Sequence, residues 1–350
     1  MDAPTAADDT SQEPIMRTAI VTTYGNPDTI DLQDRPAPTA GPTELRVQVH
    51  ASTVTQGDRR VRAGDFPGIM ALVGRLMMGW SGPRAVVPGA MFAGVVESVG
   101  NKVTAFQPGD RVFGASMAGA HADMLVIDET KGVAHIPEGV SFADAAAAQF
   151  GTGTAVPFLR DLGEVQPGNR VLIIGAGGGV GRYAVQVARH MGAHVTAVCR
   201  ADQAAWVQSL GAHDVIARDQ VDWRQVDDTW HVVFDTSDLF TFADAQDRLT
   251  AKGRFLTLGV SSWSGVWDLL RTAMSSGKRA RWTVVMDDQA NVQSVGRLLA
   301  SGAIRAVTGP RFPLERLADA HRALEERTAQ GDVIIDVIPP TPALAQQRAC

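Results

Sequence analysis

The segment VLIIGAGGGVGRYAVQVARHMGAHVTAVCR, residues 171–200, constrains the fold of this chain more than any other. An apolar run of strand length, Val171–Ile174, leads into a glycine-rich turn at Gly175–Gly181. Helical spacing follows over Tyr183–Met191, a glycine ends that helix, and His194–Val198 is rich in β-branched residues. A strand, a turn, a helix and a second strand in this order predict a βαβ unit that binds a dinucleotide.

The glycine-rich turn predicts the place of the pyrophosphate. Glycines let the backbone approach this group, and the free N–H groups at the start of the helix meet its negative charge. The turn does not follow a strict G-x-G-x-x-G pattern, and its best register is A-x-G-x-x-G. A tight turn without a ligand is the alternative. The predicted contacts are Ala176, Gly177, Gly178, Gly179, Val180 and Gly181.

The end of the second strand bears on which dinucleotide is bound. A site for NAD places Asp or Glu about 20 residues beyond the turn, on the ribose 2′-hydroxyl. Arg200 stands at about that distance here, and a guanidinium can hold a 2′-phosphate through two hydrogen bonds. Asp202 would place a carboxylate near the ribose instead, and Arg200 as a solvated strand end is a further alternative. We expect NADP(H) rather than NAD(H).

Length and composition exclude several classes of protein. A chain of 350 residues favours two domains, and a hydrophobic fraction of 45% is ample for packed cores. The net charge of −6, with both signs interspersed, predicts no nucleic-acid partner. The absence of a long apolar run and the polar, acidic start of the chain predict a cytoplasmic protein with no membrane partner. Cys199 and Cys350 are too few for a disulfide framework or a cysteine metal cluster.

The chain changes texture near residue 139. Before it, short strand patterns such as Phe92–Val99 predict a partly closed β domain. After it, beginning with a helix that Ser141 can cap, strands and helices alternate, and Phe240–Leu249 is predicted to be one of the helices. We therefore expect an α/β protein with a disordered lead-in (1–14), a substrate-binding β domain (15–138 and 308–338), a doubly wound dinucleotide-binding domain (139–307) and a flexible tail (339–350).

A series of short motifs stands in a fixed order: ASTVTQGDRRVRAG (51–64), VPGAMFAGVVESVG (87–100), FQPGDRVFG (106–114), GTGTA (151–155), SLGAHDVI (209–216), VVFDTS (232–237), GRFLTLG (253–259) and GDVIIDV (331–337). With the glycine turn, they make the chain resemble the medium-chain dehydrogenase/reductase superfamily, in its zinc-independent, quinone-oxidoreductase-like branch. The resemblance covers about Met16–Ile338. It implies a GroES-like β domain, an inserted Rossmann domain, and a homodimer through a strand at Arg281–Val285.

The residues do not assemble a zinc site. The P-G-H-E motif of zinc alcohol dehydrogenases corresponds here to Pro88-Gly89-Ala90-Met91, and neither alanine nor a thioether is a normal Zn²⁺ ligand. No cysteine precedes Cys199. His50, His121 and His135 lack the spacing of a ligand pair and are interpreted as structural. We predict no bound metal.

Without a metal, the easier reaction is hydride addition to an electron-poor carbon, since the negative charge then spreads onto an oxygen. The resemblance places the relevant segment at Thr55–Gly64, where Thr55 replaces the family's Asn. Some relatives carry a tyrosine acid where this chain has Arg60. We predict that Arg60 stabilises the oxyanion while water delivers the proton, with a surface ion pair as the alternative. Thr55 and Arg60 are the catalytic candidates, and Asp58 is interpreted as structural.

Further contacts follow from matching positions. The resemblance implies a hydroxyl near the nicotinamide at Thr154, and cofactor contacts at the strand ends Asp235 and Gly259–Val260, with ordinary strand-end packing as the alternative. The apolar segment 66–84 and the tryptophans beyond Gly259 predict a pocket for a bulky, flat acceptor. Its predicted lining is Met77, Trp80 and Trp263, with a core helix of no function as the alternative.

These observations predict an NADPH-dependent reductase that acts on a small electrophilic quinone or α,β-unsaturated carbonyl. An enoyl-thioester reductase is one alternative, and a non-catalytic, crystallin-like nucleotide-binding protein is another. A thioester substrate needs a channel that is usually basic. The side chains available for such a channel are Arg59, Arg60, Arg62, Arg75 and Arg84.

Overall fold

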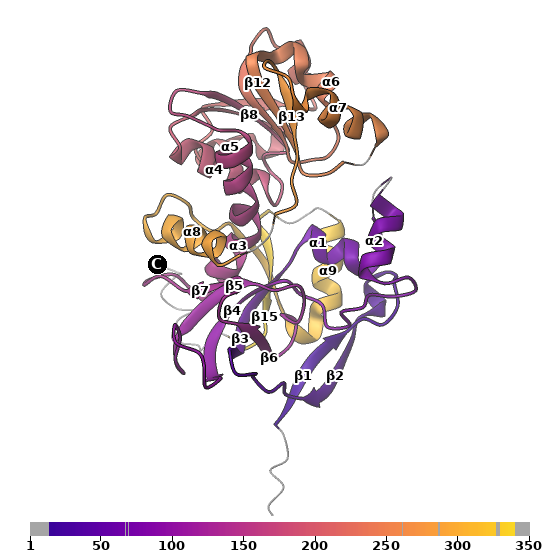
Figure 1. Cartoon of the computed structure of the whole chain (residues 1–350), viewed down its shortest axis with the longest axis vertical. Helices are drawn as coiled ribbons and strands as arrows, with labels where there is room; N and C mark the ends of the chain where they lie inside the picture. The colour runs from indigo at the N-terminus through magenta and orange to yellow at the C-terminus, as the bar shows by residue number, and fades with distance from the viewer. Residues whose placement is uncertain are drawn as a thin grey trace, which may run out of the picture.

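A computed structural model describes residues 14–339 except for 67, 69, 261, 286–287 and 327–329. Two bodies lie one above the other along the long axis of the molecule, each around its own sheet (Figure 1). The predicted α/β class, with a β domain and a parallel-sheet domain, is confirmed. The predicted lead-in lies almost wholly outside the described residues, and so does nearly all of the predicted tail.

The lower body is the β domain. Its seven-stranded sheet has the order β14-β15-β3-β4-β5-β7, and β6 pairs with β3. β3 is the long central strand, and its residues Leu45, Val47 and Val49 are fully buried on one face. β15 comes from the end of the chain and pairs antiparallel with β3, so both ends of the chain build this domain. The strands are β3 (Glu44–Val54), β4 (Met91–Val99), β5 (Arg111–Ala115), β6 (Met124–Asp128), β7 (Val133–His135), β14 (Thr308–Pro313) and β15 (Asp332–Asp336).

Two strands and three helices complete the β domain. β1 and β2 form a separate antiparallel pair, and α1 and α2 lie on the side that faces the upper body (Figure 1). Tyr24 has a structural contact in this region, because its hydroxyl donates a hydrogen bond to the carbonyl oxygen of Gly79 at 2.7 Å. The elements are β1 (Ile15–Ile20), β2 (Asp31–Pro36), α1 (Gln56–Ala63), α2 (Met70–Met78) and α9 (Leu317–Glu325).

The upper body is a six-stranded parallel sheet of order β10-β9-β8-β11-β12-β13. Its central strand β8 has the continuous apolar run of a strand buried on both faces. The strands are β8 (Arg170–Ile174), β9 (His194–Cys199), β10 (Asp214–Ala217), β11 (Trp230–Asp235), β12 (Leu249–Thr257) and β13 (Arg279–Arg281). The helices are α4 (Gly181–His190), α5 (Ala204–Ser209), α6 (Phe242–Ala245) and α7 (Trp263–Ala273). The helix α8 (Gln289–Ala300) lies lower, beside α3 and against β7 of the β domain (Figure 1).

The helix α3 (Phe142–Pro157) joins the two bodies. As predicted, the Ser141 hydroxyl caps it, accepting a hydrogen bond from the backbone N–H of Asp144 at 3.1 Å. Its alanines allow close packing against α4 and α8 as well as against β3 and β4. A second link is the hydrogen bond of 2.7 Å from the hydroxyl of Tyr183, on α4, to the carboxylate of Asp332, on β15. Burial raises the pKa of Tyr183 well above its usual value, so this group is structural.

Two predicted elements of the parallel-sheet domain have other bounds in the structure. The helix expected over Phe240–Leu249 begins only at Phe242, because Thr241 and Asp244 form a capping box there, and β12 already begins at Leu249. The strand expected over Arg281–Val285 ends at Arg281. Beyond it, the indole N–H of Trp282 donates to the carbonyl oxygen of Leu258 at 3.2 Å and holds the chain against the end of β12.

Candidate active site between the two domains

The glycine-rich turn lies between β8 and the start of α4, at the carboxyl edge of the parallel sheet. Gly175 has a φ of +78°, and the N–H of Gly178 donates to its carbonyl oxygen at 2.8 Å, which closes the turn. A Cβ on Gly181 would collide with that same oxygen and lie 2.8 Å from the Cα of Ala176. The helix can therefore pack this closely on the strand only with glycine at 181.

The turn has one open side. A Cβ on Gly179 would meet nothing within 4 Å, whereas one on Gly177 would lie 2.5 Å from the side chain of Gln203. Val180 precedes α4, and no side chain caps the helix there. Uncapped N–H groups beside an open backbone surface suit a pyrophosphate, so the residues present fit the predicted group.

The end of β9 carries a charged cluster. The Arg200 guanidinium donates to both carboxylate oxygens of Asp202, at 3.0 and 2.9 Å. This bond holds the pKa of Asp202 below its usual value. Arg200 and Asp202 were the two alternatives for the contact with the ribose, and in the structure they bind each other.

A second arginine, which the sequence did not single out, lies at this edge. Arg218 follows β10, and its N–H donates to the carbonyl oxygen of Cys199 at 2.8 Å, which joins the ends of β9 and β10. Within the part of the chain that the structure describes, the Arg218 side chain has no ion-pair partner. Burial raises the pKa of the Cys199 thiol to about 11, so this cysteine is a packed core residue. The sequence could have indicated Arg218 by its position, since it follows the carboxyl end of the strand next to β9.

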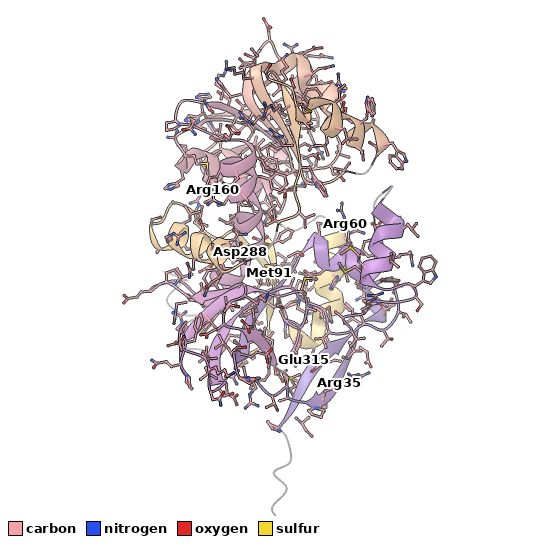
Figure 2. The ribbon with its side chains drawn as sticks, viewed as in Figure 1. Arg35, Arg60, Met91, Arg160, Asp288 and Glu315 are labelled. Atoms are coloured by element: carbon pink, nitrogen blue, oxygen red, sulfur yellow. The ribbon has the colours of Figure 1, made fainter. Side chains whose placement is uncertain are left out.

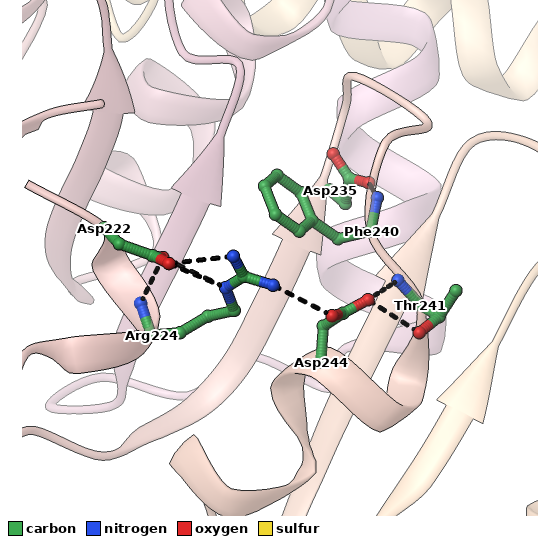
Figure 3. Close-up of polar contacts among 6 residues, drawn as sticks. All are labelled: Asp222, Arg224, Asp235, Phe240, Thr241 and Asp244. Carbon is green, nitrogen blue, oxygen red and sulfur yellow. Dashed lines mark hydrogen bonds and ion pairs between the residues drawn. The ribbon is translucent and has the colours of Figure 1, made fainter. Parts of the chain in front are cut away.

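Asp235 ends β11 and shapes the loop that follows. Its buried carboxylate accepts hydrogen bonds from the N–H and hydroxyl of Ser237, at 2.8 and 2.5 Å, and from the N–H groups of Leu239 and Phe240, at 3.0 and 2.9 Å. Figure 3 shows Asp235 beside the backbone of Phe240, and next to it the start of α6, where Asp244 receives hydrogen bonds from Thr241. The side chain that we expected to contact a cofactor is therefore engaged by its own loop.

The remaining cofactor candidates lie on α3 and after β12. The Thr154 hydroxyl donates to the carbonyl oxygen of Phe150 at 2.8 Å, which leaves its oxygen available as an acceptor. Gly259 and the buried Val260 help to line a pocket of the parallel-sheet domain, together with Asp238, Thr257 and residues of α6, α7 and β13. These positions are at the carboxyl edge of the sheet, where open α/β folds bind ligands.

The helix α1 presents the catalytic candidates from the β domain. The Thr55 hydroxyl donates to Asp58 at 2.6 Å, and the same carboxylate accepts the Thr55 N–H at 2.8 Å. This capping box starts α1 and fits the structural interpretation of Asp58. Figure 2 shows Arg60 on this helix with its side chain directed toward the upper domain. Among the described residues, no carboxylate lies within ion-pair distance of Arg60.

The three predicted pocket residues are solvent-exposed. Met77 is 62% exposed, Trp80 is 68% exposed and Trp263 is 75% exposed. The first two belong to α2 and the residues after it, and the third begins α7 on the other domain; both helices lie toward the right of Figure 1. The structure thus places these side chains on both domains without burying them in one pocket.

The position that corresponds to the zinc-binding motif of alcohol dehydrogenases lies at the start of β4. Met91 begins β4 and is buried, and its carbonyl oxygen accepts a hydrogen bond from the Ser52 hydroxyl at 2.7 Å. In the described residues, no group of three or more His, Cys, Asp or Glu side chains could hold a metal ion. No helix in that part of the chain is long and apolar enough to cross a membrane.

Comparison with known proteins gives the family. The alcohol dehydrogenase GroES-like domain matches residues 41–157, and the zinc-binding dehydrogenase model matches residues 210–335. The mouse mitochondrial NAD(P)H oxidoreductase RTN4IP1 is 28% identical over 337 residues, covering 85% of this chain and 82% of that protein. The quinone oxidoreductase of Pseudomonas aeruginosa is 27% identical over 336 residues, covering 89% and 97%. The structure of the quinone oxidoreductase from Coxiella burnetii superposes with a TM-score of 0.80 at 23% identity, covering 93% of this chain and 100% of that one.

The chain belongs to the medium-chain dehydrogenase/reductase superfamily, in its quinone-oxidoreductase-like branch. Its β domain is GroES-like and its parallel-sheet domain is Rossmann-like, as the sequence predicts. It is an oxidoreductase of this family, and the family implies that it binds a nicotinamide cofactor. Because one relative is mitochondrial, the cytoplasmic location stays a prediction.

Proposed function

We propose that this protein is a zinc-independent reductase that uses NADPH to reduce a quinone or an α,β-unsaturated carbonyl. The observation that carries the proposal is Arg60, which has no ion-pair partner among the described residues and whose side chain is directed from the β domain toward the upper domain (Figure 2). A cation in that position would stabilise the oxygen that becomes negative when the acceptor gains hydride.

The parallel-sheet domain and α3 offer candidate residues for three parts of the cofactor. The turn Gly175–Gly181 would hold the pyrophosphate at the start of α4, and Arg200 with Arg218 would hold the 2′-phosphate at the ends of β9 and β10. Thr154 and the backbone at Gly259 would then border the nicotinamide. The bound cofactor supplies the hydride, and the chain's own residues orient it and exclude water.

The choice of NADPH rests on the balance of charge at the strand ends. Arg200 shares its guanidinium with one carboxylate, Asp202, while Arg218 has no such partner among the described residues. Asp219 is a second carboxylate at this edge: it accepts the N–H of Ala201 at 2.9 Å, and its charge raises the pKa of Arg200. Two guanidinium groups, of which Arg218 has no ion-pair partner among the described residues, favour a phosphate over a hydroxyl.

Three of the five arginines that could line a channel for an enoyl thioester are bound to other groups of the chain. Arg59 pairs with Asp65 at 2.6 Å, and the buried Arg62 pairs with Glu325 on α9. Arg75 donates to the carbonyl oxygen of Trp80 at 3.0 Å. A basic channel for a phosphopantetheine or CoA arm would need these groups free.

An acceptor screen tests the proposed function. Oxidation of NADPH is followed by absorbance with 1,4-naphthoquinone, a conjugated enone and a 2-enoyl-CoA. We expect turnover with the first two and little with the thioester. Preference for the thioester would favour the alternative reductase, and NADPH binding without turnover across a broad panel would favour the non-catalytic protein.

Arg60→Ala tests the residue that carries the proposal. We expect kcat to fall by about 100-fold, within the range for removing one stabiliser of a developing negative charge, with little change in NADPH affinity. Arg59→Ala is the matched control, because this neighbouring arginine is already paired with Asp65. An unchanged kcat for Arg60→Ala would make Arg60 a surface residue.

A further inference from the structure

Asp238 has a positive φ, which is uncommon for a residue other than glycine. It lies in the loop after β11 with a φ of +58°, in the left-handed region that favours glycine. Among the described residues only Glu164, with a φ of +48°, shares this feature outside glycine. A strained backbone position that keeps a carboxylate is a reason to look for a function.

The Asp238 carboxylate has no hydrogen-bond donor among the described residues, in contrast to Asp235 three positions earlier. It lies against the backbone of Gly259, where a Cβ would come within 2.6 Å of one carboxylate oxygen. Asp238 also lines the pocket with Gly259 and Val260, the residues expected at the nicotinamide. Its carboxylate therefore lies beside a candidate cofactor contact, and no group among the described residues forms an ion pair or a hydrogen bond with it.

Arg60 faces Asp238 from the other domain. The Arg60 charge lowers the pKa of Asp238, while burial, the largest effect, and the nearby Asp235 raise it, so that the pKa stands above its usual value. Among the described residues the two groups do not form an ion pair, so Arg60 acts on the Asp238 carboxyl group through its charge at longer range.

We propose that Asp238 donates the proton that completes the reduction. This inference rests on the proposed function. Hydride from the reduced nicotinamide forms the new C–H bond, and the displaced electron pair moves onto the acceptor oxygen beside Arg60. The O–H bond of the Asp238 carboxyl group then breaks, its proton passes to the reduced acceptor, and water returns a proton to the carboxylate. The nicotinamide leaves oxidised.

Asp238→Asn tests this role, because asparagine keeps the shape and tolerates a positive φ but carries no acidic proton. With an enone as acceptor, we expect kcat to fall by about 100-fold at unchanged NADPH affinity. In the wild type, kcat should decline as rising pH deprotonates the carboxyl group, and the variant should lack this decline. The effect should be smaller with a quinone, whose hydroquinone anion takes its proton on oxygen from water.

Two further variants make the test independent of folding. Asp238→Gly relieves the backbone strain, so its melting temperature should equal or exceed that of the wild type while kcat falls as in Asp238→Asn. Glu164→Gln changes the other acidic residue with a positive φ, which pairs with Arg254 at 2.5 Å ahead of β8, away from the carboxyl edge of the sheet. It should leave kcat unchanged.

The outcomes separate the two proposals. Wild-type kcat and pH profile in Asp238→Asn would overturn the role of Asp238 and leave the reductase function standing. A wild type that reduces no acceptor would overturn the proposed function, and with it the role of Asp238.

Discussion

The two surfaces that meet at the candidate site are built differently. On the parallel-sheet side, side chains at the strand ends are engaged locally, as Asp235 is by its loop and Arg200 by Asp202. On the β-domain side, Arg60 has no ion-pair partner among the described residues, and Met77 and Trp80 are exposed. The sheet side therefore offers a cofactor mainly backbone, with Asp238 and Arg218 as exceptions. The β-domain side offers an acceptor its side chains.

Gly181→Ala challenges the backbone side and has the largest expected effect. The added Cβ collides with the carbonyl oxygen of Gly175, so the turn must open. We expect NADPH affinity to fall by about 100-fold, equivalent to about 2.8 kcal/mol, and the free energy of unfolding to fall by about 2 kcal/mol. Fluorescence titration and urea denaturation measure the two quantities.

Gly179→Ala is the control for that substitution, because its Cβ would meet nothing within 4 Å in the same turn. It should keep the stability of the wild type. If Gly181→Ala bound NADPH as the wild type does, the pyrophosphate would lie elsewhere and the contrast between the two sides would fail.

Arg218→Ala sharpens the comparison by removing a side chain from the backbone-dominated side. A lost charge-assisted hydrogen bond costs about 1.5–3 kcal/mol, so we expect NADPH to bind about 10-fold to 100-fold more weakly and NADH to bind as before. Arg200→Ala should have the smaller effect, because Arg200 is shared with Asp202. Calorimetric titration with both cofactors measures these affinities.

Asp202→Asn gives the opposite sign at the same site. It removes the carboxylate that binds Arg200, and NADPH should therefore bind more tightly. Equal loss of NADPH and NADH affinity in Arg218→Ala would argue against a 2′-phosphate at these strand ends.

The difference between the two sides also explains what the sequence could predict. The glycine turn and the Ser141 cap are local patterns, and the structure has both where the sequence places them. Arg218 and Asp238 matter through neighbours on adjacent strands or on the other domain, which spacing along one segment does not reveal. Asp235 was placed correctly at a strand end, but its four hydrogen bonds arise from a loop whose conformation no motif specified.

The exposed side chains of the β-domain side illustrate another limit. The sequence offered a core helix in segment 66–84 as the alternative to a pocket, and the structure has the helix α2 there, but a helical pattern does not say whether its apolar face is covered. Leu72 and Leu76 are 65% and 66% exposed, like Met77 and Trp80 nearby. Neither a core helix nor an enclosed pocket describes this face, since both would bury it.

The last prediction concerns the packing beneath α1. His121 and His321 are buried with ring centroids 6.4 Å apart, and both ring nitrogens of His321 lack a hydrogen-bond partner. Burial lowers the pKa of both rings; in addition, His121 and Arg62 lower that of His321, whereas Asp58 raises that of His121. The folded protein therefore keeps both rings neutral where the unfolded chain would protonate them.

Because the unfolded state binds more protons, stability should fall as the pH drops below the unfolded histidine value of about 6.5. For each ring that stays neutral in the folded protein, the free energy of unfolding should fall by about 1.4 kcal/mol between neutral pH and about pH 5.5. Urea denaturation at both pH values should show this loss, and His321→Leu should reduce it by about half. His135→Gln is the control, because His135 is exposed beside Asp110. A pH dependence unchanged by His321→Leu would mean that the buried His321 ring does not cause the loss of stability in acid.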